Sequence, residues 1–324
     1  MIRGLVIGKF YPPHRGHKFL IDSATAKVDK LFVIVCHRAG EKPDGELRAS
    51  WLREIHPGVE VLLVTDNGFD ADDSALWARL TRGWLGFIPD LVFTSEDYGD
   101  RFAECLGARH ECIDKARKTA PISGSRIRAR PLAHWEYLEP CVRGYYARRV
   151  SIVGAESTGK TTLAENLAAH YQTNWVREYG REVSERMLAQ HGAYQWRTSD
   201  FVEIARTQCR CEDEAACHSN QLLICDTDAF ATGIWHERYV GYRSPEVDLI
   251  ASTRRRPDLY LLSDFHLPFI QDGTRDGESI REWMHERFVS SLTLQQRPFA
   301  FLSGSYEDRY RQAVSAIDVL LSDQ

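Results

Sequence analysis

The 324-residue sequence has no apolar run approaching the roughly 20 residues that are needed to cross a bilayer, so we expect no membrane span. It also lacks a recognisable signal peptide, because the first residues lead directly into a strand-like segment. Its eight cysteines form no CxxC pair and no ordered His/Cys spacing, which argues against a zinc site and favours reduced thiols. These absences predict a cytoplasmic protein without membrane partners.

Neither half of the chain has an excess of basic residues. Residues 1–147 carry 21 lysines and arginines against 20 acidic residues, and the remainder carries 20 against 26, for a net charge of −5. A domain that binds DNA through its phosphates needs a basic surface, so we expect no direct DNA binding. The length favours about two domains, each large enough to bury its own core.

A phosphate-binding loop pattern lies in the middle of the chain. Residues 154–161 (GAESTGKT) satisfy every position of the pattern, between a strand-like run at 148–153 and a helix-like run at 162–171. In this motif backbone N–H groups surround phosphates, the lysine reaches the β and γ oxygens, and the next hydroxyl ligates Mg²⁺. The predicted ATP-binding residues are Gly154, Ser157, Thr158, Gly159, Lys160, Thr161 and Thr162, with Lys160 also catalytic and Thr161 also a metal ligand.

Charged side chains follow the next strand-like run, at residues 174–178. Charges at the carboxyl end of a strand point into the crevice where substrates bind. Glu178 is therefore a candidate catalytic base for a substrate hydroxyl, and Arg177 and Arg181 are candidate substrate contacts. A solvated helix start with local ion pairs is the alternative.

The apolar run from residue 221 ends in the acidic pair Asp226 and Asp228, as in the second nucleotide-binding strand of P-loop enzymes. Asp226 or Asp228 would hold the Mg²⁺ shell, directly or through water; we assign Asp226 to the metal and to catalysis, and Asp228 to the substrate. Beyond a further strand at 257–262, Arg275 and Arg281 fit a lid that closes over ATP and neutralises the transferring phosphoryl group. A plain charged loop is the alternative for each arginine.

The first half opens with a strand-like run at 3–8, followed by the loop GKFYPPHRGH at 8–17. Its two prolines disfavour the α region for the residues before them, so the next helix must start near His14. His14 and His17 would lie on one face of its first turn, where two imidazoles could hydrogen-bond phosphate oxygens and stabilise charge at a reacting phosphorus. A pair of helix-capping or surface histidines is the alternative.

Strands and helices alternate through the rest of this half, with strands at 31–36, 59–64 and 91–94 and helices at 45–55 and 72–84, which predicts a doubly wound parallel sheet. Near residue 123, Ser123 and Ser125 can cap a helix while Arg128 reaches phosphate oxygens. Trp77 and Trp84 are available to stack on a flat cationic ring, although most tryptophans in such helices belong to the core.

Residues 8–17 resemble the GxFxPxHxGH signature of the HxGH nucleotidyltransferases, and residues 122–128 (ISGSRIR) resemble their second signature, ISxTxIR, with serine where threonine is usual. The resemblance implies adenylyl transfer from ATP by direct attack of the acceptor, with catalysis by positioning and charge neutralisation. It implies ATP binding by Gly8, Lys9, Phe10, His14, His17, Ser123, Ser125 and Arg128, with both histidines and Arg128 also catalytic.

The order of these two domains, with residues 176–182 (VREYGRE) and 226–228 (DTD), is similar to the NadR family. That resemblance implies two doubly wound α/β domains: residues 1–144, a Rossmann-like nicotinamide-mononucleotide (NMN) adenylyltransferase, and residues 145–324, a ribosylnicotinamide kinase. ATP would be the co-substrate and Mg²⁺ the cofactor in both, acting on nicotinamide riboside, NMN and NAD. The family's regulators carry an N-terminal helix-turn-helix, for which we find no room before Arg3, and the sequence leaves a homo-oligomer open.

Two alternatives stay open at this point. A coenzyme A synthase arrangement also joins an adenylyltransferase to a kinase, and both signatures would look alike there. A non-catalytic sensor of NAD or ATP would bind the same nucleotides, but it need not retain the full set of phosphate-binding and metal-binding side chains.

Overall fold

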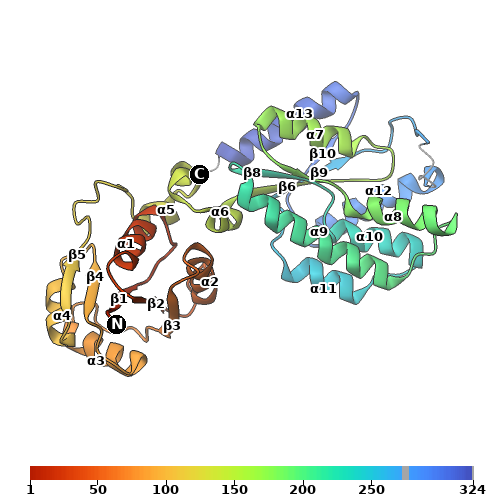
Figure 1. Ribbon diagram of the computed structural model, residues 1–324. Helices are drawn as coiled ribbons and strands as arrows, with labels where there is room; N and C mark the ends of the chain where they lie inside the picture. The colour runs from red at the N-terminus through yellow and green to blue at the C-terminus, as the bar shows by residue number, and fades with distance from the viewer. Residues whose placement is uncertain (272–276, 323–324) are drawn as a thin grey trace. The chain divides into compact units, whose positions relative to one another are not determined.

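The computed structural model describes residues 1–271 and 277–322 and divides the chain into two compact units, Met1–Val142 and Arg143–Gln324 (Figure 1). Each unit contains a five-stranded, all-parallel sheet flanked by helices, which confirms the predicted α/β fold with two parallel sheets. The predicted domain boundary follows residue 144, and the activities assigned to the two parts stay predictions. Within the described ranges, no helix has the length and apolar character that a membrane crossing requires.

The first sheet has the strand order β3-β2-β1-β4-β5. Both faces of β1 are covered, so Leu5 and Val6 are buried on opposite sides of the sheet. The strand order reverses at β1, and a crevice forms at the carboxyl ends of strands around such a switch point. The strands are β1 (Arg3–Gly8), β2 (Lys30–His37), β3 (Glu60–Thr65), β4 (Leu91–Thr94) and β5 (Arg109–Cys112); the helices are α1 (Arg15–Thr25), α2 (Gly45–Ile55), α3 (Ser74–Leu85), α4 (Gly99–Leu106) and α5 (Gly124–Ala129).

Several elements of this unit differ from the prediction. The sequence analysis did not identify α4 or β5, because both are short and β5 has no apolar periodicity. Residues after α5 form a 3₁₀ helix, η1 (Leu132–Tyr137), with a kink at His134. Beyond it, α6 (Pro140–Tyr146) continues across the division between the units as a helix.

The second sheet has the order β10-β9-β6-β8-β7, so β6 lies at its switch point. Apolar side chains of α7 and α13 pack on one face, and those of α10 and α12 pack on the other. The strands are β6 (Arg148–Val153), β7 (Trp175–Val176), β8 (Leu222–Asp226), β9 (Leu259–Ser263) and β10 (Phe299–Leu302); the helices are α7 (Lys160–Tyr171), α8 (Tyr179–His191), α9 (Thr198–His218), α10 (Ala229–Val240), α11 (Pro245–Thr253), η2 (Glu278–Ile280), α12 (Arg281–Leu294) and α13 (Tyr306–Ser322).

A buried polar chain fixes the start of α10. Arg297 donates a hydrogen bond of 2.5 Å to the Tyr260 hydroxyl, which donates one of 2.6 Å to Asp228 Oδ2. The other carboxylate oxygen, Asp228 Oδ1, accepts from the Ala231 N–H at 2.9 Å and so caps the helix. Arg297, Tyr260 and Asp228 are all buried, so each depends on its neighbours to replace water.

Replacing Tyr260 by phenylalanine removes the hydroxyl that joins this chain and leaves buried polar atoms of Asp228 and Arg297 without that partner. We expect the free energy of unfolding of the second unit to fall by about 2 kcal/mol, measured by urea denaturation of the full chain. Tyr310→Phe is the matched control, because the Tyr310 hydroxyl pairs with His170 Nδ1 at a half-buried position. If Tyr260→Phe lowers the free energy of unfolding by no more than Tyr310→Phe does, this account of the buried hydrogen-bonded chain is contradicted.

Candidate functional site

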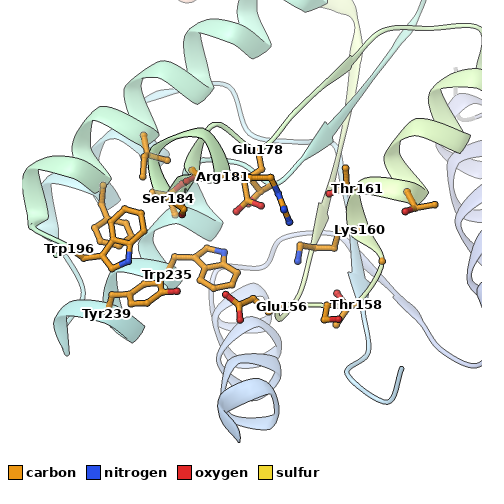
Figure 2. A pocket seen from close by; sticks show the side chains of 18 residues that line it. Glu156, Thr158, Lys160, Thr161, Glu178, Arg181, Ser184, Trp196, Trp235 and Tyr239 are labelled. Atoms are coloured by element: carbon orange, nitrogen blue, oxygen red, sulfur yellow. Dashed lines mark hydrogen bonds between the residues drawn. The ribbon is translucent and has the colours of Figure 1, made fainter. Parts of the chain in front are cut away.

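The P-loop connects the end of β6 to the start of α7 and forms one wall of a pocket in the second unit (Figure 2). Gly154 and Gly159 have φ angles of 142° and 77°, a region that side chains disfavour. A Cβ on Gly154 would also lie 2.9 Å from the carbonyl oxygen of Ser263, so a side chain at this position would clash with the backbone of Ser263. Every residue from 157 to 162 lines the pocket, as the motif predicts for a phosphate site.

Lys160 is buried at the first position of α7, and its Nζ donates to the carbonyl oxygen of Ala155 at 2.8 Å. This bond folds the ammonium group back over the loop, beside the backbone N–H groups of the helix start. A phosphate bound by those N–H groups would lie within reach of the same ammonium group.

Two carboxylates face the P-loop from neighbouring strand ends. Thr161 Oγ1 donates to Asp226 Oδ2 at 2.6 Å, and Asp226 Oδ1 is buried with no hydrogen-bond partner among the residues that the structure describes. Burial raises the pKa of Asp226, while the nearby ammonium group of Lys160 opposes that rise. Mg²⁺ takes hard oxygen ligands and keeps waters and substrate phosphates, so a hydroxyl beside an unpartnered carboxylate oxygen fits this ion.

Glu178 is the second carboxylate and precedes α8. Burial raises the pKa of Glu178 to about 7, and the negative charge of Asp226 adds to the rise. The pocket is also lined by Arg181 and Ser184, on the first turns of α8. A carboxyl group that titrates near neutral pH can accept a proton from a substrate hydroxyl.

Four aromatic side chains, Trp196, Phe201, Trp235 and Tyr239, line the other side of the pocket, and we call them the aromatic wall. The rings of Trp196, Phe201 and Tyr239 pack in a triangle, with Trp196 at centroid distances of 5.0 Å from Phe201 and 5.3 Å from Tyr239, and those two rings 6.3 Å apart. Figure 2 shows Trp235 between Trp196 and Tyr239 on one side and the P-loop side chains on the other. Thr232, Trp235 and Tyr239 recur at helical spacing on α10, which presents them on one face.

Sequence analysis missed the aromatic wall. Phe201, on α9, is buried and lines the pocket as well. The 3-then-4 spacing of Thr232, Trp235 and Tyr239, directly after the acidic pair, indicates only that these three share one helix face and not that Trp196 and Phe201 join them.

Five predicted site residues in the described part of this unit are not among the residues that line the pocket: Gly154, Arg177, Asp226, Asp228 and Arg281. Arg177 is exposed, with its guanidinium group 5.2 Å from the ring of Trp175. Asp228 belongs to the buried chain that caps α10, and Arg281 is buried and donates to the carbonyl oxygen of Leu267 at 2.8 Å. Arg275 lies outside the described residues. Their roles stay predictions.

In the first unit, the side chain of His14 caps α1, as the alternative interpretation expected. The same side chain also lines a cavity. Its Nδ1 accepts from the N–H groups of Gly16 and His17, at 3.1 and 3.4 Å. The ring proton of neutral His14 is therefore on Nε2. The His14 and His17 rings stack at a centroid distance of 3.8 Å. Phe10 is buried and meets the His17 ring edge-on at 5.0 Å.

The two histidines are neutral at physiological pH. Burial lowers the pKa of His14 to about 4, and the positive charge of Arg117 lowers it further. Burial likewise holds the pKa of His17 well below its usual value, with His14 and Arg117 contributing. The stacked pair therefore avoids like-charge repulsion, and Nε2 of His14 can act as a neutral hydrogen-bond donor.

A cavity beside the histidines is lined by both rings and by Ser123, Gly124 and Arg117. Sequence analysis did not assign Arg117 a role; its guanidinium group donates to Glu96 at 2.6 Å on the cavity wall. Ser123 caps α5, as expected from the sequence.

Ser125 and Arg128 lie on α5, and neither lines this cavity in the structure as described. Arg128 donates to the carbonyl oxygen of Tyr11 and, at 3.2 Å, to Ser125 Oγ. Its guanidinium group lies 4.3 Å from the centroid of the Tyr11 ring. Arg128 therefore braces the loop that carries the histidines, and its predicted phosphate contact stays a prediction.

A second cavity of the first unit, about 270 Å³ in volume, is lined by Gly8, Lys9 and Trp77 together with Asp66. Trp77 Nε1 donates to the carbonyl oxygen of Asp70 at 2.9 Å, which fixes the ring at this position. Both candidate stacking residues pack against the core, and of the two only Trp77 also lines this cavity.

Comparison with known proteins shows similarity along the whole chain. It is 28% identical over 347 aligned residues to the trifunctional NAD biosynthesis/regulator protein NadR of Escherichia coli (strain K12), with 99% of this chain and 84% of that protein covered. The NadR protein of Salmonella typhimurium (strain LT2) is 28% identical over 346 residues, with the same coverage. A family described as an AAA domain matches residues 149–309.

Solved NadR structures share the fold. A NadR crystal structure in complex with NR matches with a TM-score of 0.82 at 20% identity, covering 99% of this chain and 96% of that chain. A NadR structure in complex with NAD and AMP-PNP matches with a TM-score of 0.77 at 21% identity, covering 98% and 96%. The full-length similarity confirms the resemblance to NadR inferred from the motifs, and the structural matches confirm the architecture.

Glu178→Gln should change stability in a pH-dependent way. The pKa of Glu178 rises from 4.5 to about 7 on folding, so its contribution to stability is complete below about pH 4.5 and is lost as the pH rises to 7. Glutamine does not ionise, so we expect the variant to be more stable than wild type at pH 8 and to lose most of that advantage at pH 5. Thermal denaturation at the two pH values measures the difference.

Glu185→Gln is the control for this experiment, because Glu185 lies on the exposed face of the same helix. It should show no such pH dependence. Equal stabilisation of Glu178→Gln at both pH values, or none at pH 8, contradicts the buried-charge account.

Proposed function

We propose that this chain is a bifunctional NAD biosynthesis enzyme with two ATP-dependent active sites. The second unit phosphorylates nicotinamide riboside to NMN, and the first unit adenylylates NMN to NAD and releases pyrophosphate. One observation carries the proposal: the P-loop, the half-buried Glu178 and the aromatic wall line a single pocket, and Asp226 is hydrogen-bonded to Thr161 in that lining. The ligands of the similar NadR structures, which are NR, NAD and AMP-PNP, support it.

In the kinase pocket, the aromatic wall binds the nicotinamide ring, because a flat cation is attracted to the faces of tryptophan and tyrosine. Glu178 takes the proton of the riboside hydroxyl as its oxygen attacks the γ-phosphorus of ATP, and ADP leaves. Lys160 and the P-loop N–H groups hold the phosphates. Thr161 and Asp226 would hold Mg²⁺, which supplies neutralising charge on the phosphates when bound.

In the first unit, the cavity beside His14 and His17 takes the phosphates of ATP, and the cavity beside Trp77 takes the nicotinamide ring of NMN. The NMN phosphate attacks the α-phosphorus and pyrophosphate leaves. His14 donates a hydrogen bond from Nε2 to the charge that develops on the phosphate oxygens, while Arg117 supplies a positive charge nearby. Mg²⁺ is proposed as the cofactor of this reaction as well.

The aromatic wall also separates this function from its alternatives. Neither substrate of a coenzyme A synthase arrangement carries a cationic ring that would require four aromatic side chains beside the carboxylates. A pure sensor would not need a carboxyl group with a pKa near 7 opposite the P-loop lysine. Direct DNA binding is not part of the proposal, and the oligomeric state does not enter it.

Reciprocal variants test whether the two reactions use separate sites. Lys160→Ala should abolish phosphorylation of nicotinamide riboside and leave the conversion of NMN to NAD intact. His17→Ala should slow the adenylyl transfer by about 100-fold or more and leave the phosphorylation intact. Chromatography of the products from ATP, Mg²⁺ and each substrate measures both reactions. Loss of both reactions in either variant, with the fold retained, contradicts the two-site proposal.

The base assignment predicts a pH profile. Because the Glu178 carboxyl must be ionised to accept a proton, kcat for the phosphorylation should rise with pH up to about 7 and then level off. Glu178→Gln should lower kcat by about 100-fold or more and remove that limb of the profile. An unchanged kcat, or an unchanged limb in the variant, removes Glu178 from this role.

A further inference from the structure

The peptide group between Glu178 and Tyr179 is held from outside its own helix. Its N–H, which belongs to Tyr179 at the first position of α8, donates to Gln208 Oε1 on α9 at 3.0 Å. Its carbonyl oxygen, which belongs to Glu178, accepts from the Arg181 N–H at 3.2 Å. Both polar ends of this peptide group are therefore fixed, and with them the backbone from which the Glu178 side chain starts.

Gln208 lies on the helix face that continues from the pocket. Phe201 and Ile204 line the pocket, and Gln208 follows Ile204 by one turn of α9. Its side chain is completely buried, although glutamine is mostly an exposed residue. Because a buried amide is costly without hydrogen bonds, the bond to α8 accounts for a polar side chain at this position.

Glu178 is the N-cap residue of α8, but its side chain does not cap the helix. A side-chain oxygen at this position ordinarily accepts hydrogen bonds from the first N–H groups of the helix. The carboxylate lies beside that first turn, because a Cβ on Gly180 would be 3.7 Å from Glu178 Oε1. It lines the pocket instead of capping. Capping the helix and accepting a substrate proton are therefore competing uses of one carboxylate.

We propose that Gln208 supplies the hydrogen-bond acceptor that the start of α8 would otherwise take from Glu178, and so keeps the Glu178 carboxyl group in the pocket. Gln208 does not line the pocket, so it is a positioning residue that acts through Glu178. The proposal rests on the role of Glu178 as the base in the proposed phosphorylation of nicotinamide riboside. It adds that this role depends on a neutral side chain from a neighbouring helix.

The hydrogen bond can be removed without changing the charges around Glu178. Gln208 is neutral, and methionine is also unbranched and of similar length. Another carboxyl group is affected, since burial raises the pKa of Glu212 to about 8 and the amide of Gln208 opposes this rise. Glu212 is therefore largely protonated through the rising limb of the wild-type profile. The charged groups that face Glu178 are Asp226 on β8, Lys160 on α7, Arg181 on α8 and Glu156 in the P-loop.

Gln208→Met removes the acceptor, so the Glu178 carboxylate turns to cap α8 and gains N–H partners, which lower its pKa. For phosphorylation of nicotinamide riboside by the full chain, we expect kcat to fall by about tenfold or more, with KM changed by less than about threefold. The rising limb of the kcat profile should also move to lower pH by about one unit or more.

Gln208→Glu keeps an oxygen acceptor at the same position. Its limb should lie at or above the pH of the wild-type limb, because an added negative charge raises the pKa of Glu178. The opposite directions in the two variants separate positioning from structural damage. If Gln208→Met does not fold, Gln208→Glu decides, since a limb below that of wild type contradicts the proposal.

Gln312→Met is the control for the chemical change. Gln312 Oε1 accepts from the Ser303 N–H at 2.9 Å, and Gln312 does not line the pocket. The same exchange at this position should leave kcat, KM and the pH of the limb unchanged. A shift of the limb in this control equal to that in Gln208→Met overturns the proposal.

A double-mutant cycle gives a readout that needs no substrate. The stabilisation expected of Glu178→Gln at pH 8 should disappear in the Gln208→Met background, because the pKa of Glu178 is no longer raised there. A Gln208→Met protein that keeps the wild-type limb and this stabilisation overturns the positioning proposal even if its kcat falls. A wild-type protein that does not phosphorylate nicotinamide riboside overturns the proposed function, and the cycle still decides whether Gln208 keeps Glu178 in the pocket.

Discussion

The hydrogen bond from Thr161 to Asp226 joins the start of α7 to the end of β8, and the pocket of the second unit depends on this connection. It holds one carboxylate oxygen and leaves the other, Asp226 Oδ1, buried without a hydrogen-bond partner among the described residues. The resulting negative charge helps to raise the pKa of Glu178. Burial is the main cause of the raised pKa of both carboxyl groups, and their closeness to each other and to Lys160 adjusts it.

The first unit places neutral imidazole rings, rather than carboxylates, beyond the strand at which its sheet reverses order. Its sheet also reverses order at the first strand, and its histidines stand directly beyond that strand. Here burial and Arg117 keep His14 and His17 uncharged, so the cavity combines neutral imidazoles with the positive charge of Arg117. The two units thus place different chemistry at the same topological position of a parallel sheet.

The sequence was sufficient for the features that depend on local patterns. Apolar runs, glycines and short motifs identified both parallel sheets, the P-loop and the histidine pair, because each pattern is confined to about ten residues. The sequence was insufficient for features in which segments far apart along the chain come together. The aromatic wall combines Trp196 from a loop with Phe201 and Trp235 from two helices, and no spacing along the chain reports that they share a pocket. Likewise, only the structure shows that Asp228 caps a helix through Tyr260.

Helix α10 begins at the cap provided by Asp228 and presents Thr232, Trp235 and Tyr239 to the pocket from one face. Since each residue turns an α-helix by about 100°, adding or removing one residue between the cap and Trp235 would rotate both rings away from the pocket. Substitutions of individual side chains on this helix can change which nucleoside base the pocket accepts. Relatives that keep this pocket should therefore vary in the composition of α10 and hold its length constant.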